Sequence, residues 1–173
     1  MDKKSVTFTI DFETWDSFRH HTKWKDVDLI EEPTMYLLDL LRRHQIKAIW
    51  YCVGWLGDKK PELFNLIKIN GHIIGDHTYF HEGNKSFEPF RAPRWKGEKR
   101  LYSGGFWFRA MPYWWIKREV QRNGIFFIHP HDVLFEHPSC GLRTFDRRIG
   151  LKTSRDKLER LVRELEWNEP QSS

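Results

Sequence analysis

Short apolar segments alternate with amphipathic ones along this chain, and that alternation constrains its fold more than any other feature. Four segments are typical of strands: 6–12, which is rich in β-branched and aromatic residues, 46–53, the short segment 72–75, and 125–129, which is expected to be buried. Helices are predicted between and after them, at 33–44, 62–69, 113–122 and from a cap at Thr153 or Ser154 onward. Strand followed by helix, repeated, predicts an α/β fold with a largely parallel sheet. Four strands are too few to close an eight-stranded barrel, so any barrel is incomplete.

The chain has 173 residues, which suits one domain, expected over residues 1–167 with a frayed tail at 168–173. Aromatic residues make up 16% of the sequence, and this content excludes a disordered chain. The net charge of +5 is compatible with an anionic ligand but falls short of a dedicated nucleic-acid binder.

The cysteines and the N-terminal residues bear on the cellular compartment. Cys52 and Cys140 are far apart and form no CxxC pair, which excludes a zinc ribbon and a disulfide scaffold. The first residues are charged and contain no apolar stretch typical of a signal peptide. No run approaches the ~18 apolar residues of a spanning helix. We therefore expect a cytoplasmic protein without a membrane span.

Chemically reactive side chains lie at or just past the ends of predicted strands, and one lies in the extended segment FRAPRW. They are Asp11 and Glu13, then His77 and His81, then Arg91, and finally His129. Because ligands bind beyond the carboxyl ends of parallel strands, these residues are expected to gather at one edge of the sheet.

The pair His77 and His81 is spaced i, i+4, which puts both imidazoles on one face of a helical turn. Two histidines and one carboxylate form a common open catalytic metal set, and the alternative is two surface histidines. Of Asp11 and Glu13, one could bind the metal while the other takes a proton from water. The alternative for this pair is a solvated strand end.

Arg91 and His129 each allow two interpretations. Arg91 precedes Ala92-Pro93 in an extended segment, so it either orients the free carboxylate or lies on the surface. His129 is either catalytic or a buried core histidine. His131 and Asp132 are either its partners or simple loop residues.

Two tryptophans and a glycine pair are candidates for substrate contact. Trp15 and Trp95 follow the catalytic candidates and could stack on a sugar ring. Gly104-Gly105 permits unusual backbone angles, which suits either a turn or a loop that donates hydrogen bonds to substrate.

Four ordered motifs, DFETW, HTYFH, RAPRW and IFFIHPHD, resemble those of the polysaccharide deacetylase (NodB homology) family of carbohydrate esterases, family four. The resemblance implies that Asp11 is the general base and His129 the acid. It also implies a divalent metal, zinc first and otherwise cobalt, manganese or nickel. The implied ligands are Glu13, His77 and His81. Arg91 would brace the base, and Trp95 would line the site.

The segment from Gly104 to Asp132 is similar to a bacterial subfamily tied to exopolysaccharide and surface-glycan gene clusters. Gly105 and Arg109 in it are expected to bind substrate, together with Trp15 and Trp95. The chain departs from the family between its motifs, because the connecting segments are short and the D-x-x-D-W motif has no counterpart. The resemblance therefore implies an incomplete, distorted (β/α) barrel with fewer strands than usual.

The expected function is metal-dependent N-deacetylation of an acetylated amino sugar, free or carrier-linked, by a hydrolase of linear amide bonds. Two alternatives stay open: a non-catalytic glycan-binding remnant and an amide hydrolase acting on a small cyclic amide. Nucleic acid is not an expected partner, and open sheet edges could favour a homo-oligomer.

Overall fold

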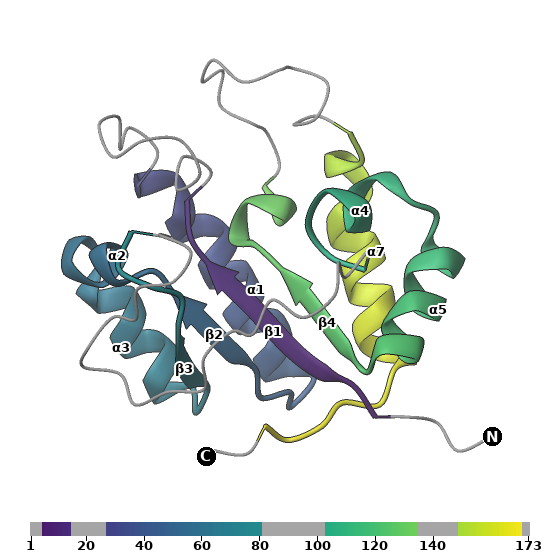
Figure 1. Cartoon of the computed structure of the whole chain (residues 1–173), viewed down its shortest axis with the longest axis horizontal. Coiled ribbons are helices and arrows are strands. Elements are labelled where there is room, and N and C mark those ends of the chain that lie inside the picture. Colours follow the sequence, from purple (N-terminus) through teal and green to yellow (C-terminus); the bar gives the residue numbers. More distant parts are fainter. Residues whose placement is uncertain (1–4, 15–26, 81–102, 135–148, 171–173) are drawn as a thin grey trace.

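The computed structural model describes residues 5–14, 27–80, 103–134 and 149–170, which form a parallel sheet with helices packed against it (Figure 1). The strands are β1 (Thr7–Phe12), β2 (Ile49–Cys52), β3 (Ile73–Asp76) and β4 (Ile125–Ile128). Within the described ranges the sheet has the order β3-β2-β1-β4, and each neighbouring pair is parallel. The predicted α/β class is confirmed. The described strands form an open sheet with β3 and β4 at its edges, as expected of an incomplete barrel.

The helices are α1 (Glu31–Arg43), α2 (Gly54–Lys59), α3 (Pro61–Ile69), α4 (Gly105–Ala110), α5 (Tyr113–Asn123) and α7 (Leu151–Glu164). Two 3₁₀ turns, η2 (Val27–Ile30) and η3 (Pro130–Val133), complete the described elements. The pattern did not predict α2, α4 or the two 3₁₀ turns, because each is too short to show a helical period. The predicted cap of α7 was wrong: Thr153 and Ser154 lie inside its first turn, and Gly150 is the N-cap.

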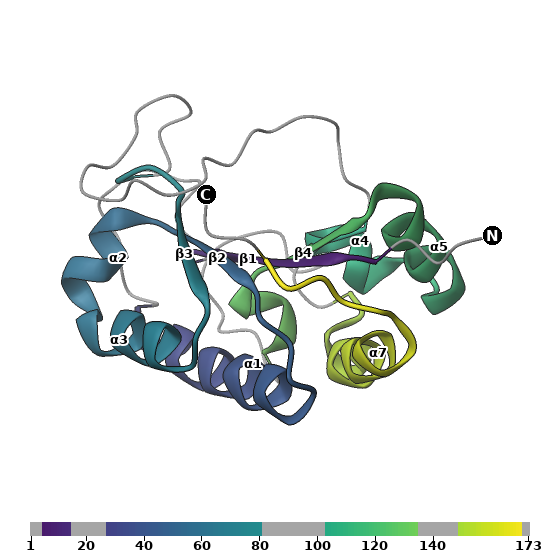
Figure 2. The same cartoon turned by 90° about the horizontal axis from the view of Figure 1, so that it is seen from below.

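The core lies between the sheet and the helices on one of its faces. Figure 2 shows α1, α3 and α7 on the same side of the sheet. Phe12 of β1 meets Phe64 of α3, with ring centroids 5.6 Å apart. Because side chains alternate along a strand, Phe8 and Phe12 face these helices and Asp11 faces the opposite side. The strand pleat thus separates apolar packing from candidate chemistry.

The end of the described chain returns to the start of β1. Trp167 forms a parallel bridge with Val6, and its ring lies 5.0 Å from that of Phe8. The backbone N–H of Asn168 donates to the carbonyl of Val6 at 2.8 Å. Across the described residues, no helix combines the length and apolar character needed to cross a membrane.

Candidate active site

Two buried carboxylates lie at the carboxyl end of β1, the central strand that pairs with β2 and β4. Asp11 is 5% exposed and Glu13 is 1% exposed. The backbone N–H of Glu13 donates to the carbonyl of Asp11 at 3.0 Å, so the chain turns directly after the strand. Burying carboxylates is costly unless partners compensate, so this pair indicates a site rather than a solvated strand end.

His77 follows β3 in a turn that α2 holds. Its backbone N–H donates to the carbonyl of Cys52 at 3.2 Å. The N–H groups of Gly54 and Trp55, at the start of α2, donate to the carbonyls of Thr78 and Tyr79. Thr78 has a φ of +63°, a left-handed conformation that β-branched residues rarely adopt. These contacts hold the strained turn and direct His77 towards β1.

The ring of His77 meets the carboxylate of Glu13. Nε2 of His77 lies 3.6 Å from Oε2 of Glu13, and both side chains are buried. Burial lowers the pKa of His77, but the carboxylates of Glu13 and Asp11 outweigh it, so the net shift is upward.

His129 follows β4 and lies on the other side of Glu13. Its Nε2 is 3.5 Å from Oε1 of Glu13 and 3.9 Å from Oδ2 of Asp11. Glu13 therefore lies between the two histidines, with one oxygen towards each. The sequence could not decide between a catalytic and a core histidine, and this position favours the catalytic interpretation.

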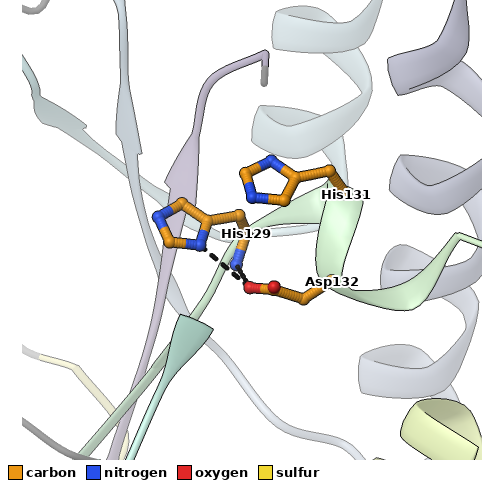
Figure 3. Close-up of side chains that lie close together, drawn as sticks. All are labelled: His129, His131 and Asp132. Carbon is orange, nitrogen blue, oxygen red and sulfur yellow. Dashed lines mark hydrogen bonds and ion pairs between the residues drawn. The ribbon is translucent and has the colours of Figure 1, made fainter. Parts of the chain in front are cut away.

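Asp132, in η3, holds His129 from behind (Figure 3). Its Oδ2 accepts the backbone N–H of His129 at 3.0 Å and lies 2.9 Å from the ring Nδ1. Its Oδ1 accepts Nε of Arg109 at 2.8 Å. Burial favours the neutral acid, but His129, His131 and Arg109 outweigh it and hold the pKa of Asp132 well below its usual range.

The ring of His129 is correspondingly basic. Burial lowers its pKa, but Asp132, Glu13 and Asp11 together raise it to about 9. The ring of His131 stacks on it with centroids 4.6 Å apart (Figure 3). The sequence left open whether Asp132 is a partner of His129 or a loop residue, and these contacts favour the partner.

Glu13 and His77 fit a divalent metal. Zinc binds carboxylate oxygen and imidazole nitrogen at about 2.0–2.2 Å in tetrahedral geometry, which separates two ligand atoms by about 3.4 Å. The observed 3.6 Å between Oε2 and Nε2 agrees with that spacing. His129, His131 and Asp132 form a second donor cluster, with atoms within 4.8 Å of one another. Both Asp132 oxygens already accept hydrogen bonds, so a metal there would have to displace Arg109 or His129.

The remaining predicted site residues divide into two groups. Gly105 lies beside the ring of His129, since a Cβ built on it would come 3.3 Å from Cε1. Arg109 is buried behind Asp132. Four predicted residues lie outside the described part of the chain: Trp15, His81, Arg91 and Trp95.

Several known proteins share stretches of this sequence. Over 50 residues the chain is 40% identical to the peptidoglycan-N-acetylglucosamine deacetylase of Bacillus cereus, covering 29% of this chain and 18% of that protein. Over 48 residues it is 31% identical to the peptidoglycan-N-acetylmuramic acid deacetylase PdaA of Bacillus subtilis, covering 28% and 18%. The matched stretch thus spans less than a fifth of each relative's length.

A solved structure of a peptidoglycan N-acetylglucosamine deacetylase aligns with 96% of this chain and 86% of its own, at a TM-score of 0.46 and 17% identity. A family model described as a domain of unknown function (DUF3473) matches residues 77–172. The polysaccharide deacetylase model matches residues 1–123, well over half of the chain. The chain therefore belongs to the polysaccharide deacetylase family.

Proposed function

We propose that this protein is a metal-dependent hydrolase that removes the N-acetyl group of an acetylated amino sugar. One observation carries the proposal: Asp11, Glu13, His77 and His129 converge from the carboxyl ends of β1, β3 and β4 in a buried cluster. Membership of the polysaccharide deacetylase family supports a hydrolase that acts on amides of carbohydrates.

Glu13 and His77 would hold the metal, with His81 as the third ligand predicted from the sequence. A divalent ion there, zinc first, supplies Lewis-acid chemistry that acidifies water and polarises a carbonyl.

Asp11 and His129 would carry the protons. Asp11 accepts a proton from the water whose oxygen bonds to the acetyl carbon. The C–N bond then breaks, and Nε2 of His129 gives its proton to the departing nitrogen. The products are acetate and a free amino sugar. Asp132 accepts a hydrogen bond from the Nδ1–H of His129 and so keeps Nε2 directed at the reacting groups.

The relatives and the charge support the proposed substrate class. The two relatives are named for N-acetylglucosamine and N-acetylmuramic acid in peptidoglycan. The net charge of +5 favours a carrier-linked sugar with an anionic diphosphate. The cytoplasmic location and the bracing of Asp11 by Arg91 stay predictions.

Acetate release tests the proposal directly. We would assay N-acetylglucosamine oligomers and UDP-N-acetylglucosamine with zinc, after chelation and after zinc is restored. Asp11→Asn should abolish acetate release, because asparagine has nearly the same shape as aspartate but cannot act as a base. Asp39→Asn is the matched control, because Asp39 is an exposed aspartate bound to Arg42 and Arg43 on α1.

Full activity in Asp11→Asn would refute the assignment of the base. Absence of acetate release together with glycan binding that survives chelation would favour the glycan-binding remnant instead. Hydrolysis of cyclic imides, with acetylated sugars left intact, would favour the cyclic amide hydrolase.

A further inference from the structure

Both carboxylate oxygens of Asp132 accept hydrogen bonds, one from Arg109 and the other from His129. Oδ2 accepts the backbone N–H of His129 and faces its ring Nδ1. Oδ1 accepts Nε of Arg109. Because the carboxylate accepts on both oxygens, Nδ1 of His129 must be the donor. Nε2 therefore faces Glu13 and Asp11.

Arg109 is itself held firmly. Its side chain is 2% exposed, and Nη1 donates to the carbonyl of Ile149 at 3.3 Å. Its backbone carbonyl packs so tightly on Gly150 that a Cβ there would lie 2.0 Å away. The guanidinium thus joins η3 to the chain that leads into α7.

The helix that carries Arg109 is also anchored at its end. Nζ of Lys157 donates to the carbonyls of Phe108, Arg109 and Met111, at 2.8, 3.1 and 2.8 Å. A cation in this position satisfies the carbonyls that end a helix. Because α7 thus fixes α4, the position of Arg109 is set by the tertiary fold rather than by local structure.

We propose that Arg109 is a positioning residue that acts on His129 through Asp132, and that it does not bind substrate directly. The inference rests on the proposed function, in which His129 protonates the leaving nitrogen. A buried carboxylate that loses its guanidinium can rotate away or take up a proton. The ring of His129 would then lose the acceptor that sets its orientation and tautomer. A side chain as buried as Arg109 offers little surface to a sugar.

A double-mutant cycle distinguishes positioning of His129 through Asp132 from direct substrate binding by Arg109. Arg109→Gln should lower kcat about tenfold to a hundredfold, the usual cost of losing an orienting partner, with KM nearly unchanged. In an Asp132→Asn background the same change should cost almost nothing, because the path through Asp132 is already broken. An undiminished loss in that background, or a loss confined to KM, would show direct substrate binding and overturn the proposal. If Arg109→Gln alone fails to fold, Arg109→Lys, which keeps a positive charge beside Asp132, replaces it in the cycle.

A spectroscopic readout needs no substrate. In the wild type, with and without zinc, we expect a protected ring N–H signal from His129 in ¹⁵N-edited NMR, assigned by its loss in His129→Gln. The signal should disappear in Arg109→Gln and survive partly in Arg109→Lys. Lysine keeps the positive charge but lacks the planar guanidinium with its fixed N–H donors. Persistence of an unchanged signal in folded Arg109→Gln would refute the proposal.

Arg155 supplies the matched control. Its Nε donates to the carbonyl of Val133 in the same 3₁₀ turn at 2.7 Å, and it pairs with Glu32. Arg155→Gln removes a guanidinium from η3 without touching the contact between Arg109 and Asp132. Equal loss of the His129 signal in Arg155→Gln would mean that any loosening of η3 suffices, and the specific role of Arg109 would be wrong. If no acetylated sugar is hydrolysed by the wild type, the proposed function fails, while the NMR comparison still decides the role of Arg109.

Discussion

His72 should make the folded protein sensitive to mild acid. The side chain is buried beside Trp50, and its Nδ1 accepts the backbone N–H of Ala48 at 3.2 Å. Burial, helped by the charge of Lys47, lowers the pKa of His72 to about 4. Protonation of Nδ1 would also replace an acceptor with a donor that faces another N–H. His72→Asn keeps a buried acceptor and removes the titration.

The size of this acid-induced loss of stability follows from the pKa values of His72 in the unfolded and folded chains. His72 titrates near 6.5 in the unfolded chain and near 4 in the folded one. Between these values the unfolded chain binds a proton that the folded chain does not, so acid favours unfolding. The contribution of His72 to stability is present above pH 6.5 and is lost as pH falls through about 4. At pH 5 the loss is about 2 kcal/mol relative to pH 7.5.

Urea unfolding at pH 7.5 and pH 5 measures this effect. A chelator is present throughout, because metal bound only to the folded state would change stability by mass action. From pH 7.5 to pH 5, the wild type should lose about 2 kcal/mol more of its unfolding free energy than His72→Asn. The comparison cancels the other titrating groups common to both proteins. Parallel losses in the two proteins would refute the assignment.

Three further perturbations follow from single contacts. Gly104→Ala should prevent normal folding, because a Cβ there would lie 2.2 Å from the backbone carbonyl of Phe127; a wild-type melting temperature by circular dichroism would contradict this. Lys157→Met should cost about 1–3 kcal/mol, because three carbonyls at the end of α4 lose their donor. Unchanged urea unfolding would argue against that contribution. His77→Ala should abolish the one equivalent of zinc expected by elemental analysis, and full retention would exclude the pairing with Glu13 as a metal site.

Much of the fold was predictable because its signals are local. The strand at Ile125–Ile128 is a run of four apolar residues, and the preceding helix α5 starts directly after Pro112 and ends at Asn123, with Gly124 as its C-cap. By contrast, α4 is six residues long and lacks a side-chain N-cap. Its stability depends on Lys157 of α7, which is 48 positions from Arg109 in the sequence, so no local pattern could indicate it.

The candidate site likewise has a part that the sequence predicts and a part that depends on tertiary contacts. The sequence by itself determined that Asp11, Glu13, His77 and His129 meet, because residues that follow parallel strands share one edge of the sheet. It left the role of Asp132 open and assigned Arg109 to substrate. Only the tertiary structure brought Arg109 behind Asp132, from which it is 23 positions away in the sequence, and buried both. The physical reason is that strand ends are arranged by backbone pairing, whereas a buried ion pair is selected by the packing of separate elements.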